Sequence, residues 1–186
     1  QIEKVKFCLD SKIALVYGKT SIIIENNYKK KINWRNLKNN LELPSDDLFY
    51  KLIHKNFIFW GSVLINKKVF IELGGIDPEL NQAEDLDILL KIAKSHSVSV
   101  VQEEVFKYRI HQNNLTHSQI DLDFFEVDKI LKTDLPDKRV YYAIHLRRLK
   151  HLILCAINLK ILSFFNLLPK INYFNILYTT CFKPIQ

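Results

Sequence analysis

The first half of the chain contains short apolar runs that predict strands. Residues 13–17 (IALVY) form a continuous apolar run and predict a short buried strand, and residues 21–25 (SIIIE) predict a second one after Gly18. Residues 56–66 (NFIFWGSVLIN) alternate and are rich in β-forming residues, so they predict a central strand interrupted at Gly61. These runs indicate a sheet in the first two thirds of the chain.

Helical spacing appears before, between and after these strands. Residues 2–9 predict the end of a helix, and residues 46–55 predict a helix capped by Ser45 or Asp46. Residues 26–40 are rich in Asn and Lys and lack periodicity, so we expect a surface loop there.

Two further helices follow the predicted central strand. Residues 67–73 predict a short helix that ends at Gly74 and Gly75, because a left-handed C-cap favours glycine. Residues 83–94 predict a longer helix, whose apolar face would consist of Leu86, Leu89, Leu90 and Ala93.

The pattern changes near residue 110. Residues 98–101 and 105–110 predict the last two strands, and from residue 121 the pattern is helical, broken at Pro136 and again at Pro169. The sequence therefore predicts an α/β domain over residues 1–118 and a helical C-terminal extension over residues 119–186.

Composition narrows the class of protein. The chain has 186 residues, of which 48% are hydrophobic, so we expect one domain with an appendage and exclude disordered and collagen-like classes. The three cysteines, Cys8, Cys155 and Cys181, lack the paired spacing of a zinc site and are odd in number. They indicate reduced thiols in a cytosolic protein.

The net charge of +7 comes from the C-terminal part, because no acidic residue follows Lys138. The helix predicted over residues 143–168 combines basic residues (Arg147, Arg148, Lys150) with an apolar face (Ile144, Leu149, Leu152, Ile153, Ala156, Ile157). Two interpretations remain open: the helix lies on an anionic membrane surface, or it packs on the domain with a solvated basic face. No nucleic-acid motif accompanies the charge, so we expect no nucleic-acid partner.

The candidate catalytic and binding residues lie between residues 57 and 117. Glu84, Asp85 and Asp87 load the first turn of the predicted helix, where carboxylates favour the helix dipole even without a function. Two predicted strands later come Tyr108, Arg109 and His111, followed by a polar turn.

These pieces together resemble glycosyltransferase family 2. The resemblance consists of the order and spacing of three motifs across roughly residues 1–118: Gly74-Gly75-Ile76-Asp77, Ala83-Glu84-Asp85-Leu86-Asp87, and Tyr108-Arg109-Ile110-His111 followed by Asn114. It implies the second, acceptor-side half of a GT-A (Rossmann-like) domain with a mixed sheet.

The resemblance also implies roles for single residues. Asp85 is the expected general base of an inverting transfer, which must take the proton of the attacking acceptor hydroxyl. Glu84 would orient acceptor or donor, and the loop after Gly74 and Gly75 would border the acceptor pocket. From its residue type alone, Trp60 would stack on a sugar face, with a core position in the apolar strand as the favoured alternative.

The expected cofactor is a divalent metal, Mg or Mn, at the diphosphate of the donor. His111 would approach this metal, or else pack under a loop. Arg109 would bind the diphosphate, with pairing to an acidic neighbour as the favoured alternative. The Asp-x-Asp motif of the donor side has no counterpart at its place in this sequence, so we expect the donor-binding half to precede Gln1 and the fragment alone to be inactive.

The intact protein would thus transfer a sugar from a nucleotide sugar donor to a glycan or lipid-linked acceptor in cell-surface polysaccharide synthesis. The alternative is a non-catalytic remnant that binds a membrane or a partner. The expected location is the cytoplasm, with peripheral attachment to the inner face of the cell membrane.

Overall fold

A computed structural model describes residues 6, 12–25, 47–111, 120–132 and 137–157 of the chain. The chain divides into two compact units, residues 1–119 and residues 120–186. Three predicted segments lie outside the described residues, except for Lys6: the helix end over residues 2–9, the loop over residues 26–40 and the chain beyond residue 157.

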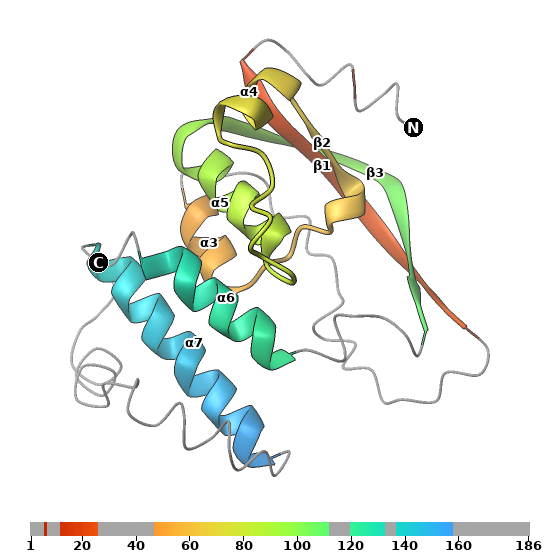
Figure 1. Ribbon diagram of the computed structural model, residues 1–186. Coiled ribbons are helices and arrows are strands. Elements are labelled where there is room, and N and C mark those ends of the chain that lie inside the picture. Colours follow the sequence, from red (N-terminus) through yellow and green to blue (C-terminus); the bar gives the residue numbers. More distant parts are fainter. Residues whose placement is uncertain (1–5, 7–11, 26–46, 112–119, 133–136, 158–186) are drawn as a thin grey trace. The chain divides into compact units, whose positions relative to one another are not determined.

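The first unit is built on a mixed three-stranded sheet with the order β2-β1-β3 (Figure 1). The central strand β1 (Ile13–Ile24) pairs antiparallel with β2 (Val63–Ile65), where Leu15 lies opposite Ile65. On its other side β1 runs parallel to β3 (Ser97–Ile110) along almost its whole length. The predicted mixed sheet is confirmed, and the strands end at residue 110 as expected.

The two short strands predicted around Gly18 are one continuous strand, so the predicted break is wrong. A Cβ atom at Gly18 would lie 2.6 Å from a methyl group of Val105 and 2.8 Å from one of Val101. The register between β1 and β3 shifts directly after this residue. Glycine at position 18 therefore allows β3 to pass close to β1 at an irregularity, instead of ending the strand.

The central strand predicted over residues 56–66 is also wrong in position and length. Only Val63–Ile65 form a strand, and this strand lies at the edge of the described sheet. The residues before it include a single 3₁₀ turn, η1 (Trp60–Ser62). A Cβ atom at Gly61 would collide with the ring of Phe106 on β3, so glycine here lets the turn pack directly on the sheet.

The described part of the first unit also contains the helices α3 (Leu48–His54), α4 (Lys67–Glu72) and α5 (Glu84–Ser95). Helices α3 and α5 pack side by side (Figure 1). Their buried side chains include Leu52, Ile53, Leu86, Leu89 and Ile92. The helix predicted over residues 83–94 is confirmed within one residue at each end, while α3 has no side-chain hydrogen bond at its N-cap, Asp47.

The double glycine ends α4 as predicted. Gly74 and Gly75 have φ angles of 86° and 66°, and the Gly75 amide donates to the carbonyl oxygen of Phe70 at 2.9 Å. The Gly74 amide donates to the carbonyl of Ile71 at 3.1 Å, which completes a Schellman motif.

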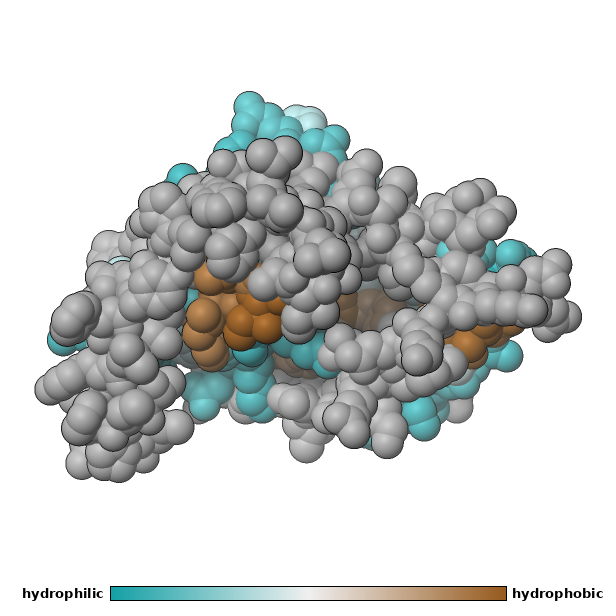
Figure 2. All heavy atoms as spheres, turned by 90° about the horizontal axis from the view of Figure 1, so that it is seen from below, coloured by the Kyte–Doolittle hydropathy of each residue, from teal (hydrophilic) through white to brown (hydrophobic). Residues whose placement is uncertain are grey.

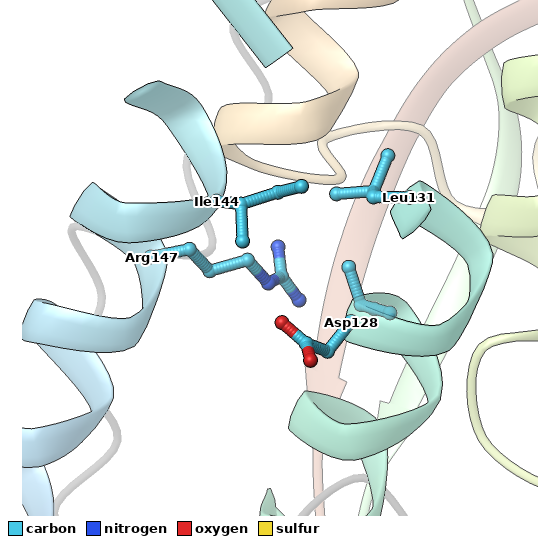
Figure 3. Close-up of a pocket in the computed structure, with 5 residues that line it drawn as sticks. Asp128, Leu131, Ile144 and Arg147 are labelled. Atoms are coloured by element: carbon cyan, nitrogen blue, oxygen red, sulfur yellow. The ribbon is translucent and has the colours of Figure 1, made fainter. Parts of the chain in front are cut away.

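The second unit contains two packed helices, α6 (Ile120–Leu131) and α7 (Lys138–Ile157). Arg148 donates to Asp128 Oδ1 through Nε at 2.8 Å and lies 2.7 Å from it through Nη2. A small pocket is lined by residues of both helices, among them Asp128 and Arg147. Within it the Arg147 guanidinium lies beside the Asp128 carboxylate (Figure 3). Of the two interpretations left open for this helix, the solvated basic face does not hold for Arg148, whose side chain is 14% exposed and pairs with α6.

Large hydrophobic side chains are exposed on both units. Figure 2 shows hydrophobic atoms at the surface, next to hydrophilic ones, on the face seen from below. The exposed set includes Ile23, Trp60, Ile71, Ile76, Phe125, Tyr142 and Ile153. Within the described residues, no helix has both the length and the apolar character that a membrane crossing requires.

Replacing Gly18 tests the close approach of β1 and β3. We expect Gly18→Ala to lower the free energy of unfolding by about 1–3 kcal/mol, because the added methyl group overpacks against valine side chains that have little rotamer freedom. Urea unfolding followed by circular dichroism measures this. Adding Val105→Ala to Gly18→Ala should recover part of the loss, and an unchanged stability of Gly18→Ala would refute the packing argument.

His145 on α7 makes the stability depend on pH. Burial lowers the pKa of His145 below its ordinary value of 6.5; the nearby Arg148 charge lowers it further and Asp128 opposes this. The unfolded chain therefore takes up a proton near pH 6.5 that the folded chain does not, so stability present above this pH is lost as the pH falls below it. We expect urea unfolding between about pH 7.5 and pH 5.5 to show this loss in the native chain and a smaller one in His145→Gln. The matched change at the exposed His54, His54→Gln, should keep the native pH dependence.

Candidate functional site

Asp85 stands in the first turn of α5 and is partly exposed. Its Oδ1 atom accepts a hydrogen bond from the Leu86 amide at 2.6 Å, which satisfies one of the unpaired amides of the helix start. Its Oδ2 atom accepts a hydrogen bond from Asn56 Nδ2 at 3.4 Å. The carboxylate is thus held from two sides and still reaches solvent.

Asn56 is a site residue that the sequence did not reveal. It follows α3, and its own Oδ1 atom accepts from the Ile58 amide at 3.2 Å. This local turn leaves the Nδ2 group directed at Asp85. The alternating pattern of residues 56–66 assigned Asn56 to a strand, and no signal in the sequence marks a contact across 29 positions.

Glu84 and Asp87, the other two acidic residues of the turn, have different surroundings. Asp87 is buried and its Oδ2 atom accepts from Lys91 Nζ at 2.6 Å, so it forms an ion pair along the helix. The Oε2 atom of Glu84 is buried, and no group in the described part of the chain donates a hydrogen bond to it. A buried carboxylate oxygen without a donor is costly, so Glu84 suits a ligand hydroxyl or cation.

An aromatic group lies along the segment that leads from Asn56 to the sheet. The ring of Phe59 lies 5.3 Å from the ring of Tyr108 on β3, and the next residue, Trp60, is 40% exposed. The alternative that Trp60 is a core residue is therefore wrong. An exposed indole on a rigid turn is a surface on which a sugar ring can stack.

The structure does not bring the end of β3 to the start of α5. Helix α5 has 12 residues and rises about 18 Å, whereas β3 has 14 residues and extends over about 45 Å. Since α5 ends beside the start of β3, the far end of β3, with Arg109 and His111, projects beyond the helix (Figure 1). Arg109 is exposed there and lies 3.7 Å from Glu25, the acidic pairing favoured from the sequence.

The remaining predictions from the sequence concern the double glycine and a metal at His111. Gly74 and Gly75 end α4, and the loop to α5 follows them. In this loop Asp77 forms a turn, since its side chain accepts from the Glu79 amide and its carbonyl accepts from the Leu80 amide. The described residues contain no group of three or more His, Cys, Asp or Glu side chains that could hold a metal ion. His111 and the acidic turn of α5 therefore do not form a metal site by themselves.

The first unit is an α/β arrangement with a mixed parallel and antiparallel sheet, and a helical extension follows it in the sequence. This architecture is consistent with a partial GT-A domain. A family model described as "Glycosyltransferase like family 2" matches residues 14–151, which is most of the chain. The chain belongs to this family. No curated protein and no solved structure gives a significant match.

Proposed function

We propose that this protein transfers a sugar from a nucleoside diphosphate donor to a hydroxyl of a glycan or lipid-linked acceptor, with Asp85 as the general base. The observation that carries the proposal is the Asp85 carboxylate, held by Asn56 and the Leu86 amide in a partly exposed position. Family membership supports glycosyl transfer in general. The proposed setting is cell-surface polysaccharide assembly on the cytoplasmic side.

The chemistry requires one well-placed base. The acceptor oxygen attacks the anomeric carbon while its proton passes to Asp85, and the bond between this carbon and the diphosphate oxygen breaks. The nucleoside diphosphate leaves on the opposite face, so the configuration at the anomeric carbon inverts. A carboxylate with a partly exposed oxygen suits the proton transfer, because the acceptor must come within hydrogen-bond reach.

Two further residues, Glu84 next to Asp85 in the sequence and Trp60 on η1, suit acceptor binding. The buried Glu84 Oε2 atom can accept a hydrogen bond from a second acceptor hydroxyl, which would supply the donor it lacks among the described residues. Trp60 offers an exposed aromatic face for a sugar ring. No step of this proposal passes through Mg or Mn, because the described residues provide no cluster of metal ligands.

Removing the base tests the proposal directly. In the protein encoded by the whole reading frame, we expect Asp85→Asn to lower kcat by about 10²–10⁴-fold, because the amide cannot take the proton. Release of nucleoside diphosphate from a panel of nucleotide sugars measures the rate. Asp87→Asn is the matched control: it removes the same charge from the same helix turn, and we expect it to weaken stability through its Lys91 ion pair while transfer continues.

The outcomes separate the two classes of function. Wild-type rates in Asp85→Asn would exclude this residue as the base. A protein from the whole reading frame that neither binds any nucleotide sugar by calorimetry nor releases diphosphate would refute glycosyl transfer and leave the non-catalytic remnant.

Asn56→Ala tests whether the neighbouring amide positions the base. An amide N–H favours the charged carboxylate, so without it we expect the acid limb of the pH–rate profile to move upward by a few tenths of a pH unit, with a lower kcat. The 3.4 Å distance sets this modest size. Asn81→Ala, at an exposed position before α5, should leave the profile unchanged. Identical profiles for Asn56→Ala and the native protein would contradict the positioning role.

A further inference from the structure

Helix α7 carries apolar residues on two opposite sides, and these sides differ in how far the described residues are buried. The inner side includes Val140, Ala143, Ile144, His151 and Leu152, all of which are buried. Because the opposite side is also apolar, the helix lacks the single polar face that an ordinary surface helix has.

The opposite side carries what we call the outer stripe, which consists of Tyr142, Leu146, Leu149 and Ile153. The steps of four, three and four residues place these side chains in one row along the helix. Tyr142 is 37% exposed and Ile153 is 50% exposed, while the two leucines between them are partly buried. The stripe therefore presents apolar surface to solvent at both of its ends.

Basic residues flank the outer stripe and no acidic residue lies within it. Lys138, Arg139 and Lys150 are exposed, and helical spacing places them along the two edges of the stripe. By contrast, Arg148 points inward to Asp128. Asp137, directly before the helix, lies 3.9 Å from Arg139. An apolar stripe edged only by cations matches the surface of an anionic bilayer, which offers acyl chains below a layer of negative headgroups.

We propose that the outer stripe of α7 docks on an anionic lipid surface. In this arrangement the stripe enters the boundary between headgroups and acyl chains, and the two lysines and Arg139 contact the headgroups. This inference is independent of the proposed glycosyl transfer, because it rests only on the second unit. The sequence alone left a membrane surface and packing on the domain open, and it placed Leu149 and Ile153 on the same apolar face as Ile144 and Leu152. The structure separates these residues and turns Arg148 away from the stripe.

Co-sedimentation of the whole chain with lipid vesicles tests the proposal. We expect binding to vesicles of phosphatidylglycerol and phosphatidylcholine, and much weaker binding to phosphatidylcholine alone. Ile153→Ser should lower the partition coefficient by about tenfold, because less apolar surface leaves water. Ile71→Ser is the matched control, since Ile71 on α4 is 64% exposed in the other unit, and it should bind as the native chain does.

A second pair of variants tests the charges without touching the stripe. Lys138→Gln combined with Lys150→Gln should lower the partition coefficient by roughly tenfold or more, since each cation at an anionic surface contributes about fivefold. Lys67→Gln combined with Lys68→Gln on α4 removes the same charge from the other unit and should have a small effect. Circular dichroism of every variant shows whether α7 has remained folded, and the lysine pair keeps the test valid if Ile153→Ser unfolds.

Several results would overturn the proposal. Equal binding to neutral and anionic vesicles would remove the role of the cations, and native binding by Ile153→Ser would remove the role of the stripe. A stripe-dependent dimer in gel filtration, without vesicle binding, would assign the surface to a second copy of the chain. Binding to single-stranded nucleic acid but not to vesicles would assign the cations to a different partner.

Discussion

The parallel pairing of β1 with β3 is the constraint on which the first unit depends. Two neighbouring parallel strands cannot be joined by a tight turn, so the chain must cross from the end of β1 back to the start of β3. Helix α5 makes the last part of this crossing and ends one residue before β3. Its first turn is thereby carried away from the start of β3, and Asp85 arrives next to Asn56 after α3. The position of the proposed base is thus a consequence of strand direction, and glycines at positions 18 and 61 let the paired elements approach closely enough.

The sequence predicted the features that depend on local patterns. The apolar spacing of Leu86, Leu89 and Leu90 defined α5, and two adjacent glycines defined the end of α4, because only glycine readily adopts two successive positive φ angles. The family resemblance agreed with the match to residues 14–151. It also directed attention to Asp85, whose catalytic role remains a proposal.

The predictions that were wrong concern features that depend on contacts between residues far apart in the sequence. Gly18 was predicted to separate two strands, but it lies within one. Its role is a close contact with valines more than 80 positions later, which no local pattern indicates. The run from Asn56 to Asn66 has the composition of a strand. In the structure a three-residue turn at Gly61 packs on Phe106, and only the last part of the run, Val63–Ile65, forms a strand. The contact between Asn56 and Asp85 has no local signal at all. On α7, the sequence placed Leu152 and Ile153 on one apolar face, whereas the structure buries Leu152 and leaves Ile153 half exposed. The neighbouring helix also binds Arg148 through Asp128, which no local pattern on α7 indicates.

The ion pair between Asp128 and Arg148 also changes how far the charge of the protein reaches. A formal net charge of +7 describes the chain as a set of independent ions, but a guanidinium bound to a buried carboxylate contributes mainly a local dipole. The potential that an approaching molecule meets around α7 therefore comes from fewer cations than the sequence contains, all of them at the solvent boundary. Mobile counterions screen such surface charges within about 8 Å at physiological ionic strength. Encounters with this helix will thus be governed by short-range contact, and added salt will change the rate of approach only modestly.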